Sequence, residues 1–113
     1  MNCLFCKIAA GEIPSQKLYE DENVVAFRDI APQAPNHFLV IPRQHISTLN
    51  DIDASHAELL GHMQLTGARL AKELQIAEDG FRFVMNCNRQ GGQTVYHIHL
   101  HVLGGRQMSW PPG

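Results

Sequence analysis

Residues 97–101 read His-Ile-His-Leu-His, so three imidazoles occupy every second position and alternate with apolar side chains. In an extended strand, successive side chains point to opposite faces. The histidines would then lie on one face about 6.6 to 7 Å apart, with Ile98, Leu100 and Val102 in the core behind them. Imidazole can act near neutral pH as nucleophile, general acid, general base or metal ligand. Because the chain has seven histidines, chance spacing remains an alternative.

A glycine-containing loop, Gly91-Gly92-Gln93-Thr94, ends three residues before His97. Glycine leaves backbone N–H groups with little steric cover, and the glutamine amide and threonine hydroxyl add polar groups. A glycine pair by itself marks only a turn. Its position beside the histidines favours a loop that holds the oxygens of an anion such as phosphate.

The cysteines indicate a second kind of chemistry. Cys3-x-x-Cys6 has the spacing of zinc ligands, and His45 and His97 can complete a tetrahedral Cys2His2 set. The odd count of three cysteines, two of them close together, disfavours a secreted disulfide scaffold. One Cys-x-x-Cys pair is weak evidence for a metal, and plain burial is the alternative, which we expect for Cys87.

Composition limits the functional classes. The chain has 113 residues, of which 44% are hydrophobic, and a formal net charge of -2, which predicts a single domain over residues 1–113 with a modest core. Basic residues form no stripe, so we expect no nucleic-acid duplex and no membrane as partner. Apolar stretches stay well below the roughly eighteen residues of a membrane span, and no leader pattern is present, which predicts a cytoplasmic protein.

Hydrophobic periodicity predicts an α+β domain that positions these groups. We expect a short helix over residues 5–10, ended by Gly11, and a long helix of about twenty residues that starts at a capping box, Ser55 to Glu58. Alternating segments predict strands over residues 17–20, 24–29, 37–41, 81–86 and 95–103. The long helix would cover one face of the sheet.

Several motifs together resemble a known family. Residues 97–103 match the His-φ-His-φ-His-φ-φ signature of the histidine triad (HIT) superfamily. Residues 27–35, 37–42, 91–94 and 104–108 resemble the Hint branch, the histidine triad nucleotide-binding proteins. The resemblance runs from Cys3 to Gly113, and several motifs in the same order make it more specific than the triad alone.

The resemblance implies a HIT-like fold: a five-stranded antiparallel sheet, one long helix, a short N-terminal helix and a two-fold homodimer. Burial in a dimer also suits a sheet whose two faces cannot both be covered by one helix. The tail, residues 108–113, resembles a terminus that reaches the neighbouring subunit's site. Trp110 is then either a wall of that site or a packed terminal anchor.

The activity implied by the resemblance is hydrolysis of purine nucleoside 5′-phosphoramidates, which releases AMP or GMP and an amine without an organic cofactor. The middle histidine of the family is the nucleophile, here His99, and forms a nucleotidyl-histidine intermediate. His101 and His37 are expected to donate hydrogen bonds to the phosphate oxygens, and one of them to help protonate the amine. Thr94 stands where relatives often carry serine, and its methyl group can crowd the leaving group.

The resemblance also implies a nucleotide-binding set: Phe27, Asp29, Ile30, Asn86, Gly92, Gln93, Val95, His99 and His101. Asp29 is expected at the ribose hydroxyls and Phe27 and Ile30 beside the purine, with Asn86, Gln93 and the Val95 backbone at ribose and phosphate. Alternatively, Phe27 and Ile30 are core residues and Asp29 a turn residue. For the metal set Cys3, Cys6, His45 and His97 the support is partial, since many relatives lack the cysteines.

Three other functions stay open. A nucleotide-binding interaction module would bind the same ligand with little turnover. A zinc-centred structural protein would use all the histidines as ligands and leave the loop at residues 91–94 unexplained. A dinucleoside polyphosphate hydrolase of the Fhit-like branch would carry glutamine at the position of His101, so that residue argues against it.

Overall fold

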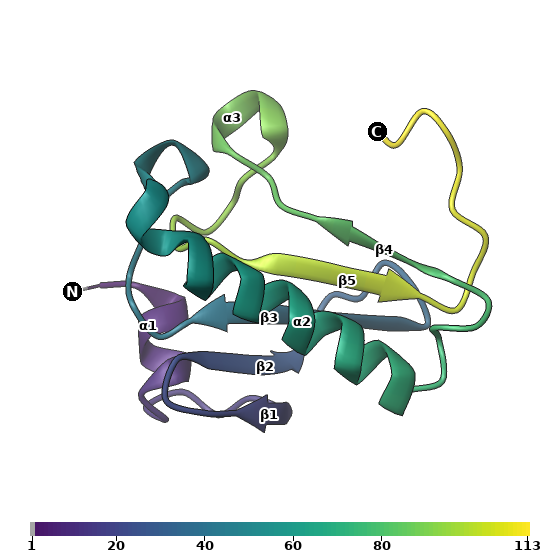
Figure 1. The fold of residues 1–113 in the computed structure, drawn as a ribbon, viewed down its shortest axis with the longest axis horizontal. Helices are drawn as coiled ribbons and strands as arrows, with labels where there is room; N and C mark the ends of the chain where they lie inside the picture. The colour runs from purple at the N-terminus through teal and green to yellow at the C-terminus, as the bar shows by residue number, and fades with distance from the viewer. Residues whose placement is uncertain (1) are drawn as a thin grey trace.

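Five strands form one antiparallel sheet in the computed structural model, which describes residues 2–113 (Figure 1). The strands are β1 (Lys17–Glu20), β2 (Val24–Arg28), β3 (Asn36–Pro42), β4 (Phe81–Val84) and β5 (Leu100–Gly104), in the order β1-β2-β3-β5-β4. The helices are α1 (Leu4–Ala9), α2 (Ala57–Glu73) and α3 (Asn88–Gly91), with the 3-10 turns η1 (Leu49–Asp51) and η2 (Ala54–His56). The predicted α+β class and five-stranded antiparallel sheet are confirmed. Of the described helices, none is long and apolar enough to cross a membrane.

Helix α2 lies across one face of the sheet (Figure 1). Its apolar positions, including the buried Met63 and Leu70, pack on Phe38 and Val40 of β3 and on the buried apolar residues of β5. Gly67 permits this approach, because a Cβ atom there would lie 3.2 Å from the ring of Phe83. This layer is the larger part of the core.

The opposite face is covered in part by α1. Phe5 and Ile8 of this helix pack on Phe27 of β2 and on Leu39 and Ile41 of β3. Strand β3 therefore alternates between the two layers, as an extended strand buried on both faces must. Helix α1 therefore covers part of the face that the long helix does not reach.

The triad segment differs from the predicted strand over residues 95–103. Strand β5 begins only at Leu100, which pairs with Val40. The ladder stops there because the carbonyl oxygen of Pro42 accepts a hydrogen bond from the ring Nε2 of His97 (2.7 Å). The backbone N–H of Ile98 donates to the carbonyl of Ile46 (2.8 Å), outside the sheet. The side chains nonetheless keep alternating, with Ile98 in the α2 layer.

The predicted capping box at Ser55 and Glu58 is wrong. The hydroxyl of Ser55 donates to Oδ1 of Asp53 (2.6 Å), and the N-cap residue of α2 makes no side-chain capping bond. Instead, η1 and η2 carry the capping boxes, centred on Thr48 and Asp53. The chain thus enters α2 through two short turns, and the helix has 17 residues rather than about twenty.

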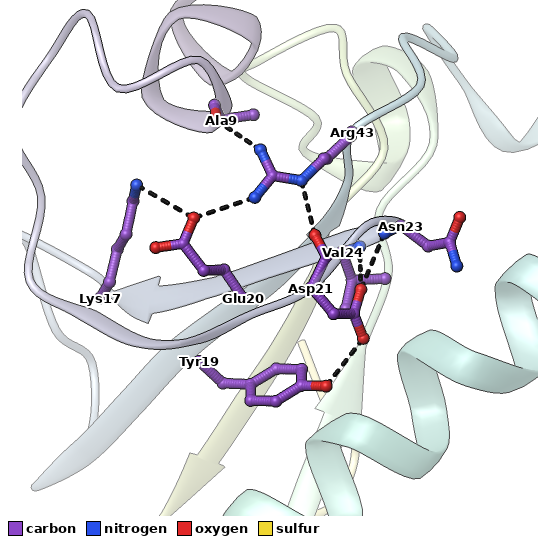
Figure 2. A network of polar contacts seen from close by, with 8 residues as sticks. All are labelled: Ala9, Lys17, Tyr19, Glu20, Asp21, Asn23, Val24 and Arg43. Atoms are coloured by element: carbon purple, nitrogen blue, oxygen red, sulfur yellow. Dashed lines mark hydrogen bonds and ion pairs between the residues drawn. The ribbon is translucent and has the colours of Figure 1, made fainter.

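A polar network ties the β1–β2 turn to α1 (Figure 2). The guanidinium group of Arg43 donates to the carbonyl of Ala9 at the end of α1 (2.6 Å), to the carbonyl of Asp21 (2.7 Å) and to the carboxylate of Glu20 (2.9 Å). The Asp21 carboxylate accepts from the backbone amides of Asn23 and Val24 (both 2.8 Å). These bonds anchor the C-terminal end of α1 independently of any group at its N-terminal end.

We expect Asp21→Ala to lower the free energy of unfolding by about 2 kcal/mol at pH 7, because several hydrogen bonds to one carboxylate are lost. Partial burial opposes ionisation, but hydrogen bonds from Asn23, His62 and Val24 hold the pKa of Asp21 well below its ordinary value. The carboxylate therefore contributes stability above about pH 4 and loses it as the pH falls further. Urea unfolding at pH 7 and pH 3 measures this, and an equal deficit at both pH values would contradict it.

Candidate active site

A cavity of about 270 Å³ opens on the α1 face of the sheet, beside the triad. Its walls include Phe27, Asp29, Ile30, Thr94, Val95, His99 and His101 from the residues predicted for the site, and Leu4, Phe5, Ile8, Ile13 and Leu39, which sequence reasoning did not name. The apolar walls suit a flat aromatic group, and His99 and His101 line the same cavity.

Three of the lining residues bear on alternatives that the sequence left open. Ile30 is 99% exposed, so it is not a core residue. Phe27 is buried, and it belongs both to the core under α1 and to the cavity wall. The carboxylate of Asp29 accepts from the backbone N–H of Ala31 (2.8 Å), which makes it a turn residue that also faces the cavity.

His99 is buried and has one ring nitrogen committed. Its Nδ1 lies 2.8 Å from the carbonyl oxygen of His97. A carbonyl oxygen only accepts, so Nδ1 carries the proton and Nε2 of the neutral ring carries a lone pair. Burial lowers the pKa of His99 below its ordinary value, which keeps the ring neutral at pH 7. The geometry leaves this imidazole with an available lone pair.

His37 and His101 form a hydrogen-bonded pair with a defined direction. The backbone N–H of Gln33 donates to Nδ1 of His37 (3.0 Å), so the proton of the neutral ring is on Nε2. That Nε2 lies 2.9 Å from Nδ1 of His101 and donates to it. Nε2 of the neutral His101 ring must then carry a proton. Burial, with the neighbouring His99 and His37, lowers the pKa of His101 to about 4.

The ligand atoms of Asp29, His37 and His101 lie within 4.8 Å of one another, as in a metal site. The Gln33 amide argues against that use. A metal bound to Nε2 of a neutral His37 ring requires the ring proton to be on Nδ1. The backbone N–H of Gln33 is directed at Nδ1, so that nitrogen cannot carry a proton as well. This group is arranged as a chain of hydrogen-bond donors that ends at His101.

The loop over residues 91–94 is braced by one of its own side chains. Gln93 is buried, its Nε2 donates to the carbonyls of Ser47 (2.8 Å) and Val95 (3.0 Å), and its Oε1 accepts from the amide of Asn88 (2.9 Å). This differs from the expected contact of its amide with phosphate. Asn86 and Gly92 are likewise not among the described residues that line the cavity.

The second predicted cluster is brought together as well. Sγ of Cys3 lies 3.4 Å from Nδ1 of His97, and Sγ of Cys6 lies 3.4 Å from Nδ1 of His45 and 3.5 Å from Nδ1 of His97. The four ligand atoms are within 4.8 Å of one another. Helix α1 supplies this geometry, because Cys3 is its N-cap and accepts from the amide of Cys6 (3.3 Å). We call these four residues the thiol cluster.

The thiol cluster fits a tetrahedral zinc ion. With Zn–S of about 2.3 Å and Zn–N of about 2.05 Å, a tetrahedral site places sulfur and nitrogen about 3.5 Å apart. Nε2 of His97 donates to the carbonyl of Pro42 (2.7 Å), which leaves the Nδ1 lone pair directed at both sulfurs. A fixed outer hydrogen bond of this kind is typical of metal-ligating histidines. Nε2 of His45 has a similar partner in Ser47 Oγ (3.2 Å).

The fold and these groups define a class of protein: a small α+β domain with a cavity of about 270 Å³ lined by histidines. The family model for the HIT domain matches residues 10–108. The chain belongs to the HIT domain family.

Close relatives agree with this assignment. A purine nucleoside phosphoramidase of Escherichia coli strain K12 is 54% identical over 105 residues, which cover 93% of this chain and 88% of the relative. A crystal structure of a HIT family hydrolase from Legionella pneumophila Philadelphia 1 is 57% identical, with a TM-score of 0.98 over 99% of this chain and 100% of that one. A histidine triad protein from Clostridium difficile is 45% identical, with a TM-score of 0.93 over 96% and 95%.

Proposed function

We propose that this protein is a purine nucleoside 5′-phosphoramidate hydrolase that releases AMP or GMP and an amine. One observation supports the proposal: His99, whose Nε2 carries a lone pair, and His101, whose Nε2 carries a proton, line the same cavity with their ring centroids 4.9 Å apart. The relative named purine nucleoside phosphoramidase, at 54% identity, supports the same reaction. A hydrolase that acts on P–N bonds needs a nucleophile and an acid for the amine, and the site offers both.

In the proposed reaction, Nε2 of His99 attacks the phosphorus atom and the P–N bond breaks. His101 donates its Nε2 proton to the departing amine, and the negative charge left on its ring is balanced by the positive charge on the nucleotidyl ring of His99, which keeps its Nδ1 proton. Water then hydrolyses the nucleotidyl bond on His99, returns a proton to His101 and releases the nucleoside monophosphate. His37 holds His101 in the donating tautomer through its own Nε2 proton. Each histidine stays in the role that its other hydrogen bond fixes.

The nucleotide is proposed to occupy the cavity with its purine against Phe27 and Ile30 and its ribose hydroxyls at Asp29. The exposed side chain of Ile30 supports this, because a large apolar group at a cavity rim gains burial when a base covers it. The phosphate would then lie beside Thr94 and the backbone amide of Val95. Gln93 braces this loop through its hydrogen bonds with the amide of Asn88 and the carbonyl of Val95.

Turnover of a panel of nucleoside 5′-phosphoramidates tests the proposal. We expect AMP or GMP and amine to appear in equal amounts from adenosine and guanosine substrates. Tight AMP binding without detectable turnover of any member would favour the rival function, a nucleotide-binding interaction module. The same assay with a dinucleoside polyphosphate examines the remaining enzymatic alternative.

The acid limb of the pH profile provides a prediction about His37 and His101. Burial lowers the pKa of both rings, that of His101 to about 4, so His101 should remain neutral at pH 6 and His37 should be protonated less than an ordinary imidazole. We expect kcat/KM at pH 6 to stay within about twofold of its value at pH 7.5. An essential imidazole of ordinary pKa, about 6.5, would cost about fourfold. A fourfold loss in the measured profile contradicts the assignment.

We also propose that the thiol cluster holds one structural zinc ion. Zinc there would link α1 to His45, in the loop after β3, and to His97 in the triad segment. Its chemistry would be that of a closed four-ligand site, which contributes folding free energy and takes no part in the reaction. The sulfur-to-nitrogen distances of 3.4 and 3.5 Å and the fixed tautomer of His97 support this.

A two-fold homodimer completes the proposal. Strand β4 is at the sheet edge, Leu65 of α2 is 72% exposed, and Trp110 is 82% exposed, so the tail is no packed anchor within one chain. We expect sedimentation to show a dimer that survives removal of residues 109–113. The truncation should change kcat/KM for a bulky aromatic amine more than for a plain phosphoramidate. A monomer before truncation, or equal changes for both substrates, contradicts this.

A further inference from the structure

Helix α1 belongs to two sites at once. It has six residues, too few for a helix to be stable by itself in water, so its position depends on its anchors. Cys3 and Cys6 of the thiol cluster flank Leu4 and Phe5, and these two residues line the nucleotide cavity. Any change in the contacts of Cys3 and Cys6 within the thiol cluster therefore acts directly on the cavity wall.

Phe5 is the residue that would transmit a shift of α1 to the cavity. Its ring centroid lies 5.0 Å from that of His99, 5.6 Å from that of Phe27 and 6.0 Å from that of His97, all with edge-to-face geometry. Phe5 is buried, and packed interiors transmit small displacements. A shift of α1 would move the cavity wall and release one side of the His99 ring.

The two ends of α1 are held by different means. At the C-terminal end, the Arg43 guanidinium donates to the carbonyl of Ala9 (Figure 2). At the N-terminal end, the links across to the sheet and loop include the sulfur contacts of Cys3 and Cys6 with His97 and His45. Sulfur is a weak hydrogen-bonding group, so without a metal these contacts hold the helix poorly.

A second connection runs through His97. Its ring belongs to the thiol cluster, and its carbonyl oxygen accepts the Nδ1 proton of His99. The residue that would ligate a metal therefore also orients the imidazole of the cavity. Both connections lead from the thiol cluster to the same side of the nucleotide site.

We propose that zinc in the thiol cluster positions α1 and thereby sets the nucleotide affinity of the cavity. The inference rests on the zinc site proposed above and makes the cluster a positioning element. With zinc bound, four metal–ligand bonds fix the first turn of α1 and the ring of Phe5 against His99. Without zinc, that turn loosens while Arg43 still holds the far end, and the cavity loses part of its apolar wall.

Calorimetric titration with AMP, together with amide hydrogen exchange of residues 4–9, tests this without any turnover. We compare zinc-loaded wild type, chelator-treated wild type and Cys6→Ala, with Cys87→Ala as the matched control outside the cluster. We expect the Kd for AMP to rise about tenfold in the two zinc-free samples, with faster exchange confined largely to α1. Cys87→Ala should match the wild type in both measurements.

Phe5→Leu provides the second variant. It keeps the four metal ligands but removes the ring that contacts His99, so the ratio of zinc-free to zinc-loaded Kd should fall well below tenfold. An unchanged Kd on zinc removal overturns the proposal, as does a raised Kd without faster exchange in α1. Global unfolding of the zinc-free samples, or no zinc binding by wild type, also overturns it. Because AMP binding is the readout, absence of phosphoramidase activity would not affect the result.

Discussion

His99→Ala is expected to abolish phosphoramidate hydrolysis and to leave AMP binding nearly unchanged. The variant removes the lone pair at Nε2, whereas the cavity walls at Phe27 and Ile30 stay in place. Loss of a nucleophile that works as part of a unit typically costs a factor on the order of 10⁴ or more in rate. Single-turnover kinetics with an adenosine 5′-phosphoramidate and calorimetry with AMP measure the two effects separately.

His56→Ala is the matched control, because His56 lies on the turn before α2, outside the cavity walls. It should retain full activity. Substantial turnover by His99→Ala would exclude a covalent mechanism on this residue. A variant that loses AMP binding together with activity would instead mean that His99 holds the ligand.

Cys6→Ser should reduce the zinc content from close to one ion per chain to nearly none and lower Tm by about 10 °C or more. The substitution removes a sulfur that approaches both ligating histidines, at 3.4 Å from His45 and 3.5 Å from His97. Metal analysis and calorimetric melting of the same preparation measure the change. Activity should fall less steeply than in His99→Ala, because the nucleophile lies elsewhere.

Cys87→Ser is the control for a lost thiol, since Cys87 lies outside the thiol cluster at the start of α3. It should keep both zinc and Tm. Wild-type protein that is folded, active and metal-free after purification without chelators would contradict the zinc site. His97 would then serve only to orient His99 through its carbonyl.

The parts of the site that were predictable from the sequence depend on short-range rules. Alternation at residues 97–102 holds even before the ladder begins at Leu100, because Ile98, Leu100 and Val102 all lie in the α2 layer. The Cys-x-x-Cys spacing likewise fits one helical turn, with Cys3 as the N-cap. Such local geometry can be read without knowledge of the fold.

Other features depended on contacts between distant segments. The sequence predicted that Gln93 contacts phosphate. In the structure its side-chain amide instead forms hydrogen bonds with the backbone carbonyl of Ser47 and the backbone N–H of Asn88, two groups that require partners. The part played by α1 in the cavity was missed because its apolar residues look like ordinary core positions. A signal was present: if Cys3 and Cys6 meet His97, the residues between them must lie beside the triad.

Trapping of the covalent intermediate tests the central claim most directly. Enzyme mixed with an adenosine 5′-phosphoramidate and quenched in denaturant within the first turnover should carry one adenylyl group on His99, assigned by fragmentation within the peptide that also contains His97 and His101. The adduct should appear before free AMP, decay as AMP forms and be absent in His99→Ala. AMP release in the first turnover without an adduct, or with the adduct on His101 or His37, would contradict the account.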